Sequence, residues 1–199
     1  MTLFITTKRF LLIISLLLLP LSWAKAATIM IVGDSLSASY GMPENKGWVY
    51  LLEQTMPQHQ WINASSSGET TGGGLRRLTG ILEHQSPDVI FIELGGNDGL
   101  RGFPPKKMKN NLEKMVDLAK SSGAKVLLSE VIIPPNYGPR YSSLFTKVFQ
   151  EVAEEKEVEL VPFFMRQIAI DPSLMQQDGI HPNQKAQPII ADIMRPYFE

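Results

Sequence analysis

Five short apolar segments alternate with stretches of helical periodicity, and this alternation constrains the fold of the chain more than any other feature. The segments are 28–33, 60–63, 88–94, 125–133 and 158–161. Several are almost continuously apolar, which is typical of parallel strands covered on both faces. The pattern therefore predicts an α/β fold, a doubly wound three-layer α/β/α sandwich with right-handed crossovers.

Four segments have apolar residues spaced so that they share one face of a helix. The faces consist of Leu75, Leu78, Ile81 and Leu82; of Met108, Leu112, Met115 and Val116; of Leu144, Val148, Phe149 and Val152; and of Ala186, Ile189, Ile190 and Ile193. The second helix is expected to begin after Pro104–Pro105 and end before Gly123, and the last to begin near Pro182. Gly72–Gly74 opens the first helix at a cost of about 1 kcal/mol per glycine relative to alanine, so we expect mobility there.

The N-terminal segment is predicted to be a cleaved secretory signal. Lys8 and Arg9 precede an apolar run over 10–21, and Ala24-Lys25-Ala26 fits a small-x-small cleavage site. A single-pass anchor is the alternative, but the run is shorter than the roughly 20 apolar residues that span a bilayer. We predict cleavage after Ala26, a single domain over 27–199, and a periplasmic or secreted protein with no stable membrane anchor.

Composition excludes several classes of function. The chain has no cysteine, which excludes a disulfide framework, a thiol nucleophile and a thiolate metal site. The formal net charge is −1, with scattered charges rather than the basic patch that nucleic-acid binding requires. No metalloprotease, Walker or dinucleotide-binding pattern occurs, nor the Gly-x-Ser-x-Gly elbow of α/β-hydrolases. We expect a monomer without cofactor or metal.

Two segments supply the residue types of serine hydrolysis. Ser35 directly follows the first apolar segment, within Gly-Asp-Ser-Leu, and Asp178-Gly179-Ile180-His181 lies near the other end of the chain. A strand delivers such a serine to the carboxyl edge of the sheet, where α/β proteins build their sites. A hydroxyl, an imidazole to take its proton and a carboxylate to orient the imidazole form a catalytic triad in any chain order.

Each of these residues also has a structural interpretation. Ser35 fits a turn or helix N-cap, Asp178 a loop acid and His181 a helix-start residue before a proline. The other two of the three histidines, His59 and His84, lie in polar stretches and are expected to be solvated.

Small residues follow the second and third predicted strands. Gly68 lies in Asn-Ala-Ser-Ser-Ser-Gly-Glu-Thr, and Asn97 lies in Gly-Gly-Asn-Asp-Gly. Glycine lets a backbone N–H approach a substrate closely, and an asparagine amide can donate to a developing oxyanion. Both are therefore candidate oxyanion donors, with ordinary turn residues as the alternative. Asp98 is interpreted as a structural turn former.

Taken in order, these four blocks resemble those of the SGNH or GDSL hydrolases, and the resemblance covers the whole mature chain. It is particularly close for the bacterial periplasmic thioesterase and lysophospholipase branch, through 93–103 and 178–183. It implies a five-stranded sheet with the flavodoxin-like order 2-1-3-4-5, and Ser35, His181 and Asp178 as the triad. The Ser35 N–H is implied to join Gly68 and Asn97 in the oxyanion hole.

The resemblance implies hydrolysis of acyl esters and thioesters, with esterase, thioesterase and lysophospholipase activity. We expect several residues to rim the site and accept an acyl chain, namely Leu100, Phe103, Ile133, Pro134, Pro135 and Tyr137. Two alternatives stay open at this point: a carbohydrate-ester deacetylase of the same family, and an acyl-binding protein that has lost catalysis. The segment Gly99–Phe103 is predicted to move as acyl chains bind, with Gly99 and Gly102 as hinges.

Overall fold

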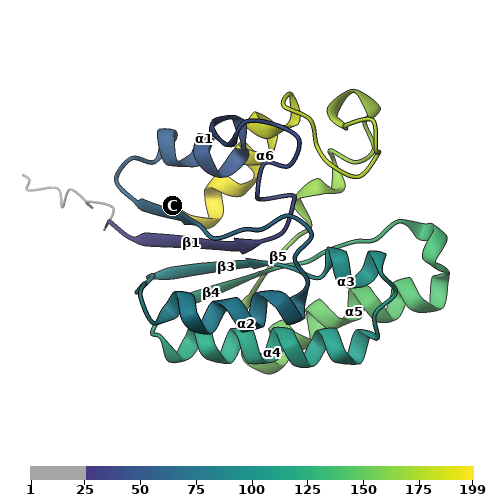
Figure 1. The fold of residues 1–199 in the computed structure, drawn as a ribbon, viewed down its shortest axis with the longest axis horizontal. Coiled ribbons are helices and arrows are strands. Elements are labelled where there is room, and N and C mark those ends of the chain that lie inside the picture. Colours follow the sequence, from purple (N-terminus) through teal and green to yellow (C-terminus); the bar gives the residue numbers. More distant parts are fainter. Residues whose placement is uncertain (1–25) are drawn as a thin grey trace, which may run out of the picture.

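A five-stranded parallel sheet forms the centre of the protein in a computed structural model that describes residues 26–199 (Figure 1). The strands are β1 (Thr28–Gly33), β2 (Gln60–Asn63), β3 (Val89–Glu93), β4 (Lys125–Ser129) and β5 (Glu159–Val161), in the spatial order β2-β1-β3-β4-β5. Both the three-layer α/β/α fold and the strand order 2-1-3-4-5 expected from the sequence are confirmed. The predicted signal segment lies outside the described residues, except for Ala26.

Helices cover both faces of the sheet (Figure 1). On one side lie α1 (Trp48–Thr55) and α6 (Ala186–Met194), and on the other lie α2 (Thr71–Leu82), α3 (Gly96–Leu100), α4 (Pro105–Ser121) and α5 (Pro139–Lys156). Short 3-10 helices occur at Glu44–Lys46, Pro135–Tyr137, Phe164–Arg166, Pro172–Leu174 and Arg195–Tyr197. Within residues 26–199, no helix has the length and apolarity needed to cross a membrane.

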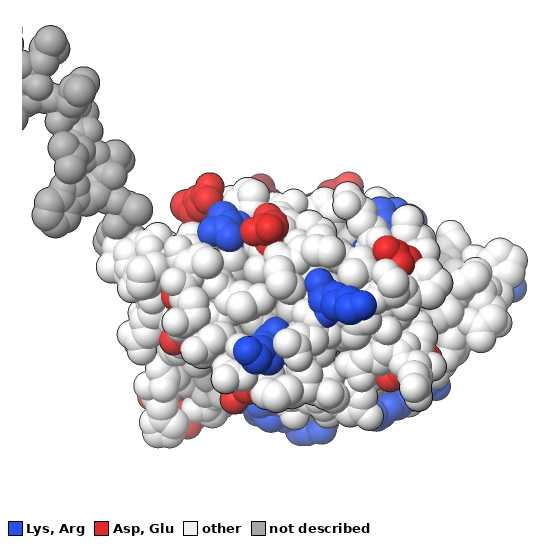
Figure 2. All heavy atoms as spheres, turned by 90° about the horizontal axis from the view of Figure 1, so that it is seen from above, with Lys and Arg blue, Asp and Glu red and all other residues white. Residues whose placement is uncertain are grey.

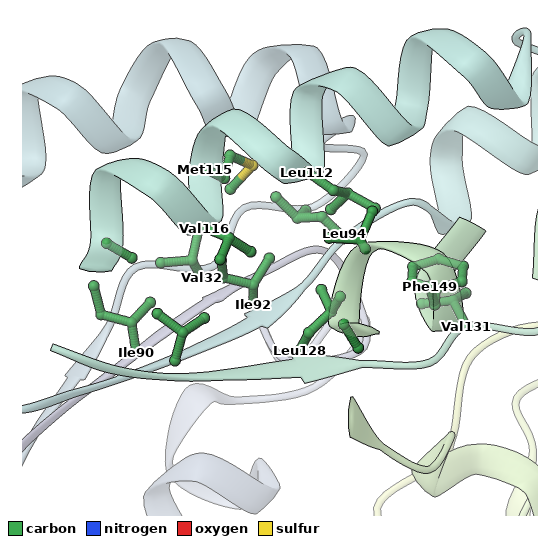
Figure 3. Close-up of a cluster of buried hydrophobic side chains, with 14 of the residues drawn as sticks. Val32, Ile90, Ile92, Leu94, Leu112, Met115, Val116, Leu128, Val131 and Phe149 are labelled. Carbon is green, nitrogen blue, oxygen red and sulfur yellow. The ribbon is translucent and has the colours of Figure 1, made fainter. Parts of the chain in front are cut away.

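The pleat of the strands divides the core into two clusters. Met30 and Val32 of β1 face α2, α4 and α5, whereas Ile29 and Ile31 face α1 and α6. The larger cluster, seen in Figure 3, places Leu112 and Met115 of α4 above Ile92 of β3. Because successive side chains of a strand point to opposite faces, an unbroken apolar run is what a sheet buried on both sides requires.

The limits of several elements differ from the sequence prediction. The predicted strand 125–133 ends at Ser129, because the chain leaves the sheet there and continues toward Pro134–Pro135. Val131 and Ile133 are still buried, so apolarity alone did not distinguish strand from core loop. Helices α1 and α3 were not predicted. The last helix begins at Ala186, four positions after Pro182.

Two residues assigned to buried helix faces are exposed. Leu144 of α5 is 51% exposed and Ile189 of α6 is 41% exposed. In α5 the buried position is taken by Phe145, which is fully buried beside Phe149. The prediction of this helix was correct, as was the burial of Val148, Phe149 and Val152, and the error concerns only the first position of its apolar face.

The topology positions the site. Strands β1 and β3 are neighbours, with Gly33 in register with Glu93, although β2 lies between them in the sequence. Ligands of open α/β sheets bind where the strand order reverses in this way, outside the carboxyl ends of the strands. On the face seen in Figure 2, charges of both signs are scattered among uncharged residues.

Candidate active site

Ser35 lies in a tight turn at the carboxyl end of β1. The Asp34 carbonyl accepts the N–H of Ala38 at 2.9 Å, and the Asp34 carboxylate accepts the N–H of Leu36 at 3.0 Å. Gly33 is needed before this turn because a Cβ there would lie 2.8 Å from both the Glu93 carboxyl and Ser37. The turn therefore holds the serine at the switch point of the sheet.

The structure joins Ser35, His181 and Asp178 in one hydrogen-bonded chain. His181 Nε2 lies 2.8 Å from Ser35 Oγ, and His181 Nδ1 lies 2.7 Å from Asp178 Oδ2. The second Asp178 oxygen accepts the backbone N–H groups of Ile180 and His181 at 2.9 and 3.0 Å. Partial burial raises the pKa of Asp178, but these hydrogen bonds outweigh it and bring the pKa down to about 2.

This arrangement has the geometry that proton transfer requires. An ionised Asp178 accepts the Nδ1 proton of the neutral ring, which leaves Nε2 free to accept the proton of Ser35 Oγ–H. The residues sit 146 positions apart in the sequence and meet through the fold. The Asp178 side chain is partly exposed to solvent, at 37%.

Gly68 and Asn97 lie on the two turns that flank Ser35. The Gly68 residue has φ +77°, a left-handed conformation that favours glycine, and its carbonyl accepts from the Arg101 guanidinium at 3.0 Å. In the described chain, the N–H groups of Ser35 and Gly68 make no hydrogen bond to another backbone group. Asn97 donates one amide proton to Asp34 Oδ2 at 3.0 Å, which leaves the other available to a ligand.

Two buried acids lie beneath these groups. Asp34 is 2% exposed, and burial raises its pKa to about 6 despite the hydrogen bonds from Leu36 and Asn97. Glu93 is fully buried, and burial followed by repulsion from Asp34 raises its pKa well above the ordinary value. One Glu93 oxygen accepts from Ser37 Oγ at 2.8 Å and from the Asp34 N–H at 3.3 Å. Glu93 was not predicted from the sequence, although a glutamate within an apolar strand is unusual and is a signal for such a site.

Asp98 has a structural position, in agreement with the sequence interpretation. Its two oxygens accept from Thr71 Oγ1 at 2.7 Å and from the Thr71 N–H at 2.8 Å. Asn111 of α4 donates to the same Thr71 hydroxyl at 3.0 Å. The two Asp98–Thr71 bonds fasten the start of α2 to α3, and so fix the turn that contains Gly68 relative to the turn that contains Asn97.

The glycines at the start of α2 have a packing role. Gly73 lies against the carboxyl group of Glu69, and Gly74 lies against Leu94 so closely that no Cβ fits. Thr70 caps the helix by accepting the Gly73 N–H at 3.2 Å. The glycines lower the helix propensity of this segment, but they allow α2 to approach the end of β3 closely.

A cavity of about 510 Å³ opens beside Ser35 and His181. Of the residues expected to rim the site, Leu100, Ile133, Pro134 and Pro135 line it. Phe103 and Tyr137 are not among its lining residues. The Tyr137 hydroxyl instead donates to the Leu100 carbonyl at 2.9 Å, and Phe103, 36% exposed, lies beside Lys107.

One wall of this cavity was missed by sequence reasoning. It comes from the segment between β5 and the Asp-x-x-His motif, namely Phe163, Met165, Arg166, Ala169, Ile170 and Met175. Since β5 ends at the same sheet edge as β1 and β3, and His181 must return to Ser35, the intervening segment has to pass the site. That topological argument could have identified the wall from the sequence. Most of the lining is apolar, and Arg166 is paired with Glu130 at 2.8 Å.

The remaining histidines have no part in this cluster. His84 is exposed, as expected. His59 was expected to be solvated, but it is half-buried, and its Nδ1 accepts the N–H of Ala27 at 3.1 Å. It lies at the opposite end of β1 from Ser35, where it holds the start of the strand. Among residues 26–199, no group of three or more His, Asp or Glu side chains is arranged to hold a metal ion.

Comparisons with known proteins find a matching family and similar proteins. The model of the GDSL-like Lipase/Acylhydrolase family matches residues 31–188. An arylesterase of Vibrio mimicus is 47% identical over 170 residues, 83% of this chain and 85% of the relative. Thioesterase 1/protease 1/lysophospholipase L1 of Escherichia coli K12 is 43% identical over 180 residues, 90% of this chain and 86% of the relative.

A solved structure is similar over almost the same range. The psychrotrophic esterase EstA from Pseudoalteromonas sp., inhibited by monoethylphosphonate, has a TM-score of 0.84 and 50% identity, covering 86% of this chain and 96% of that chain. AlinE4, an SGNH-hydrolase family esterase, has a TM-score of 0.75 at 32% identity, covering 89% and 97%. The matched range of the family model contains every residue of the candidate site, from Ser35 to His181.

Proposed function

The chain belongs to the family of GDSL-like lipases and acylhydrolases and is an ester-hydrolysing enzyme, and we propose that Ser35 is its nucleophile, with acyl esters and thioesters as substrates. The observation that supports this most strongly is the continuous chain from Ser35 Oγ through His181 to Asp178, with distances of 2.8 and 2.7 Å, at the mouth of an apolar cavity. Both distances are within the range required of a nucleophile, its base and an orienting group.

In the proposed acylation step, Ser35 Oγ attacks the acyl carbonyl while its proton passes to His181 Nε2. The carbonyl oxygen becomes an oxyanion, which accepts from the N–H groups of Ser35 and Gly68 and from the Asn97 amide. The intermediate then expels the alcohol or thiol, which takes the proton from His181. The product of this half-reaction is an acyl ester of Ser35.

Deacylation repeats these roles with water as the nucleophile. His181 removes a proton from water as its oxygen attacks the acyl group, and the same proton returns to Ser35 Oγ when the acid leaves. Asp178 stays ionised throughout and stabilises the imidazolium that forms in each step. Neither half-reaction needs a group beyond these side chains, the oxyanion donors and water.

The lining of the cavity supports medium or long acyl chains over acetyl groups. Leu100, Val131, Ile133 and Met165 contribute apolar surface, and transfer of each methylene of a bound chain from water is favourable by about 0.8 kcal/mol. A carbohydrate-ester deacetylase would instead need polar partners for a sugar. No observation favours that alternative, nor a binding protein without activity.

A series of p-nitrophenyl esters from acetyl to dodecanoyl, together with the matching acyl-coenzyme A thioesters, tests the proposal. We expect kcat/KM to rise with chain length until the chain fills the cavity, and then to level off or fall. Ser35→Ala should abolish turnover of every member while leaving the melting temperature within a few degrees. A preference for acetyl esters would favour the deacetylase, and full activity of Ser35→Ala would exclude the proposed nucleophile.

We also propose that residues 1–26 are an export signal, so that the enzyme acts in the periplasm or outside the cell. The charged start, the apolar run and the small residues at 24 and 26 support this. The proposal implies a mature protein that begins at Ala27.

A further inference from the structure

Tyr40 makes a contact with the proposed base that the mechanism above does not use. Its ring centroid lies 4.3 Å from that of His181, and the two planes are inclined by 36°. The Tyr40 residue is 47% exposed. The ring therefore covers one face of the imidazole, whose edges are already occupied by Ser35 and Asp178.

The backbone holds Tyr40 in this position at a conformational cost. Ser39, directly before it, has φ +59°, a left-handed conformation that costs a non-glycine residue about 1 kcal/mol or more. Ser39 is nevertheless buried, 7% exposed, close against Gly47. Such strained residues persist where the surrounding structure over-determines them, and they cluster at functional sites.

Gln176 fastens the two segments that bring the rings together. Its amide donates to the Tyr40 carbonyl at 2.8 Å and to the Pro182 carbonyl at 3.1 Å, and Pro182 follows His181. Gly41, with φ +75°, permits this bridge because a Cβ there would lie 2.5 Å from the Gln176 side-chain oxygen. The stack is thus a fixed part of the site, although the turn after β1 and the Asp-x-x-His turn are far apart in the sequence.

Resting on the proposed function, we infer that Tyr40 is a positioning residue that fixes the plane of His181 and stabilises its protonated form during catalysis. An aromatic face attracts a cation placed within about 6 Å of its centroid. Asp178 alone stabilises the imidazolium incompletely, because 37% of the Asp178 side chain is exposed and water screens its charge. The ring of Tyr40 shields one face of the imidazolium from that solvent.

The charged groups around His181 give the expected sign of a pH effect. Asp178 faces Nδ1 from the same turn, buried Asp34 at the end of β1 interacts with the ring electrostatically, and Arg166 of the cavity wall is paired with Glu130. None of them changes when Tyr40 is replaced. Loss of the aromatic face alone makes the imidazolium less stable, so the acid limb of the pH dependence of kcat/KM should move to lower pH.

The test compares Tyr40→Leu with Tyr40→Phe, which keeps the ring and removes only the hydroxyl. We expect Tyr40→Leu to lower the plateau kcat about fivefold with little change in KM, the size expected of one exposed cation–π contact. The acid limb of the pH dependence of kcat/KM should shift to lower pH in Tyr40→Leu. In Tyr40→Phe both kcat and the position of this limb should be those of the wild type. Because Tyr40 is half in solvent, neither variant should lose its fold, and thermal melting checks this.

A second measurement does not depend on turnover. The titration of the His181 ring, followed by nuclear magnetic resonance in Ser35→Ala protein, should shift to lower pH with Tyr40→Leu and remain in place with Tyr40→Phe. An unchanged kcat and titration in Tyr40→Leu, or a rise in KM alone, would overturn the inference, the latter by making Tyr40 a substrate contact. Wild-type protein without esterase activity would contradict the proposed function instead, while leaving the ring titration to be measured.

Discussion

At the scale of single residues, the most informative side chain is Asn97, because its amide has both a structural and a proposed catalytic partner. The amide donates one proton to Asp34 Oδ2 at 3.0 Å, and Asn97 lines the cavity. We expect Asn97→Ala to lower kcat by about 10²–10³-fold, about 3–4 kcal/mol, with a much smaller change in KM, because its hydrogen bond strengthens as the oxyanion forms.

Asn111→Ala is the matched control for Asn97→Ala. Asn111 is likewise an amide with one side-chain partner, the Thr71 hydroxyl, but it is buried on α4 and does not line the cavity. Its removal should lower the melting temperature with kcat almost unchanged. If Asn97→Ala gave this same pattern, Asn97 would be a turn residue only.

Asp178 and His181 are predicted to act as a unit. Asp178→Asn keeps a hydrogen bond to the ring but favours the wrong tautomer, so kcat should fall by about 10³–10⁴-fold with little effect on substrate binding or melting temperature. His181→Ala should be at least as damaging. Steady-state kinetics at neutral pH check this, and a wild-type rate in either variant would mean that another base serves Ser35.

The buried acids predict an unusual dependence of stability on pH. Burial raises the pKa of Asp34 to about 6 and raises that of Glu93 in the same direction. At these two sites the native state therefore binds more protons than the unfolded chain between about pH 4 and 6, so their contribution to stability falls as the pH rises through this window. Melting temperatures should be higher at pH 5 than at pH 7.5.

Asp34→Asn is the control for this pH effect, because it removes the titrating group and keeps a similar shape. The difference in melting temperature between the two pH values should shrink in this variant. Asp178 acts in the opposite direction, since its pKa is lowered to about 2, so its contribution is lost only below about pH 4. A melting temperature that rose steadily from pH 5 to pH 7.5 would contradict the assignment of the buried pair.

At the scale of elements, the segment Gly99–Phe103 remains the predicted moving part. It adjoins the proposed oxyanion donor and is held by two tyrosines, through Tyr137 to the Leu100 carbonyl and Tyr141 to the Phe103 carbonyl at 2.7 Å. Gly102 has φ +66° and open space around it, whereas Gly99 is packed 2.5 Å from Ile133 at its Cβ position. The structure thus favours Gly102 as the hinge.

Hydrogen exchange with and without a long-chain fatty acid tests this movement. We expect the amides of 99–103 to change their protection when the acid binds, and Tyr137→Phe, which removes one latch, to raise exchange in the free enzyme. The segment 105–121 serves as the internal reference, because α4 is packed along its whole length. Identical protection of the segment in both states would contradict the prediction.

The sequence was sufficient for the elements whose pattern has a single explanation. Short apolar segments, several of them almost continuous, predicted all five strands, and the small polar residues that follow them located the site edge. It was insufficient where apolarity has two explanations, as at Val131 and Ile133, which are buried in a loop beside the cavity. Helix α3 was missed because its five residues, rich in glycine, have low helix propensity and are held by tertiary contacts.

The candidate site was also predicted only in part from the sequence. Ser35, Asp178 and His181 could be named because the chain has only three histidines and the motifs occur in order, and the structure brings the three residues together. Phe103 and Tyr137 were expected at the rim, but both lie outside the cavity lining, since proximity in the sequence does not give the direction of a side chain. Tyr40 and the wall around Ile170 depend on the return path of the chain, which no local pattern encodes.

At the scale of the whole molecule, export is predicted to remove residues 1–26. Cleavage there would make Ala27 the new N-terminus, and the backbone nitrogen of Ala27 donates to His59 Nδ1 at 3.1 Å. Intact-mass measurement of the exported protein should give a chain that starts at Ala27. Retention of Met1 in the exported protein would contradict the prediction, and an Ala24→Asp/Ala26→Asp variant, which blocks the cleavage site, is the control.

The central claim is that hydrolysis passes through an acyl group on Ser35. Mixing the enzyme with a fluorophosphonate and mapping the modified peptide by mass spectrometry tests this most directly, since such reagents bond to an activated serine. The account predicts stoichiometric labelling at Ser35, strongly slowed in His181→Ala and blocked by a saturating long-chain ester. Labelling of a different residue, or full labelling of Ser35→Ala protein, would contradict it.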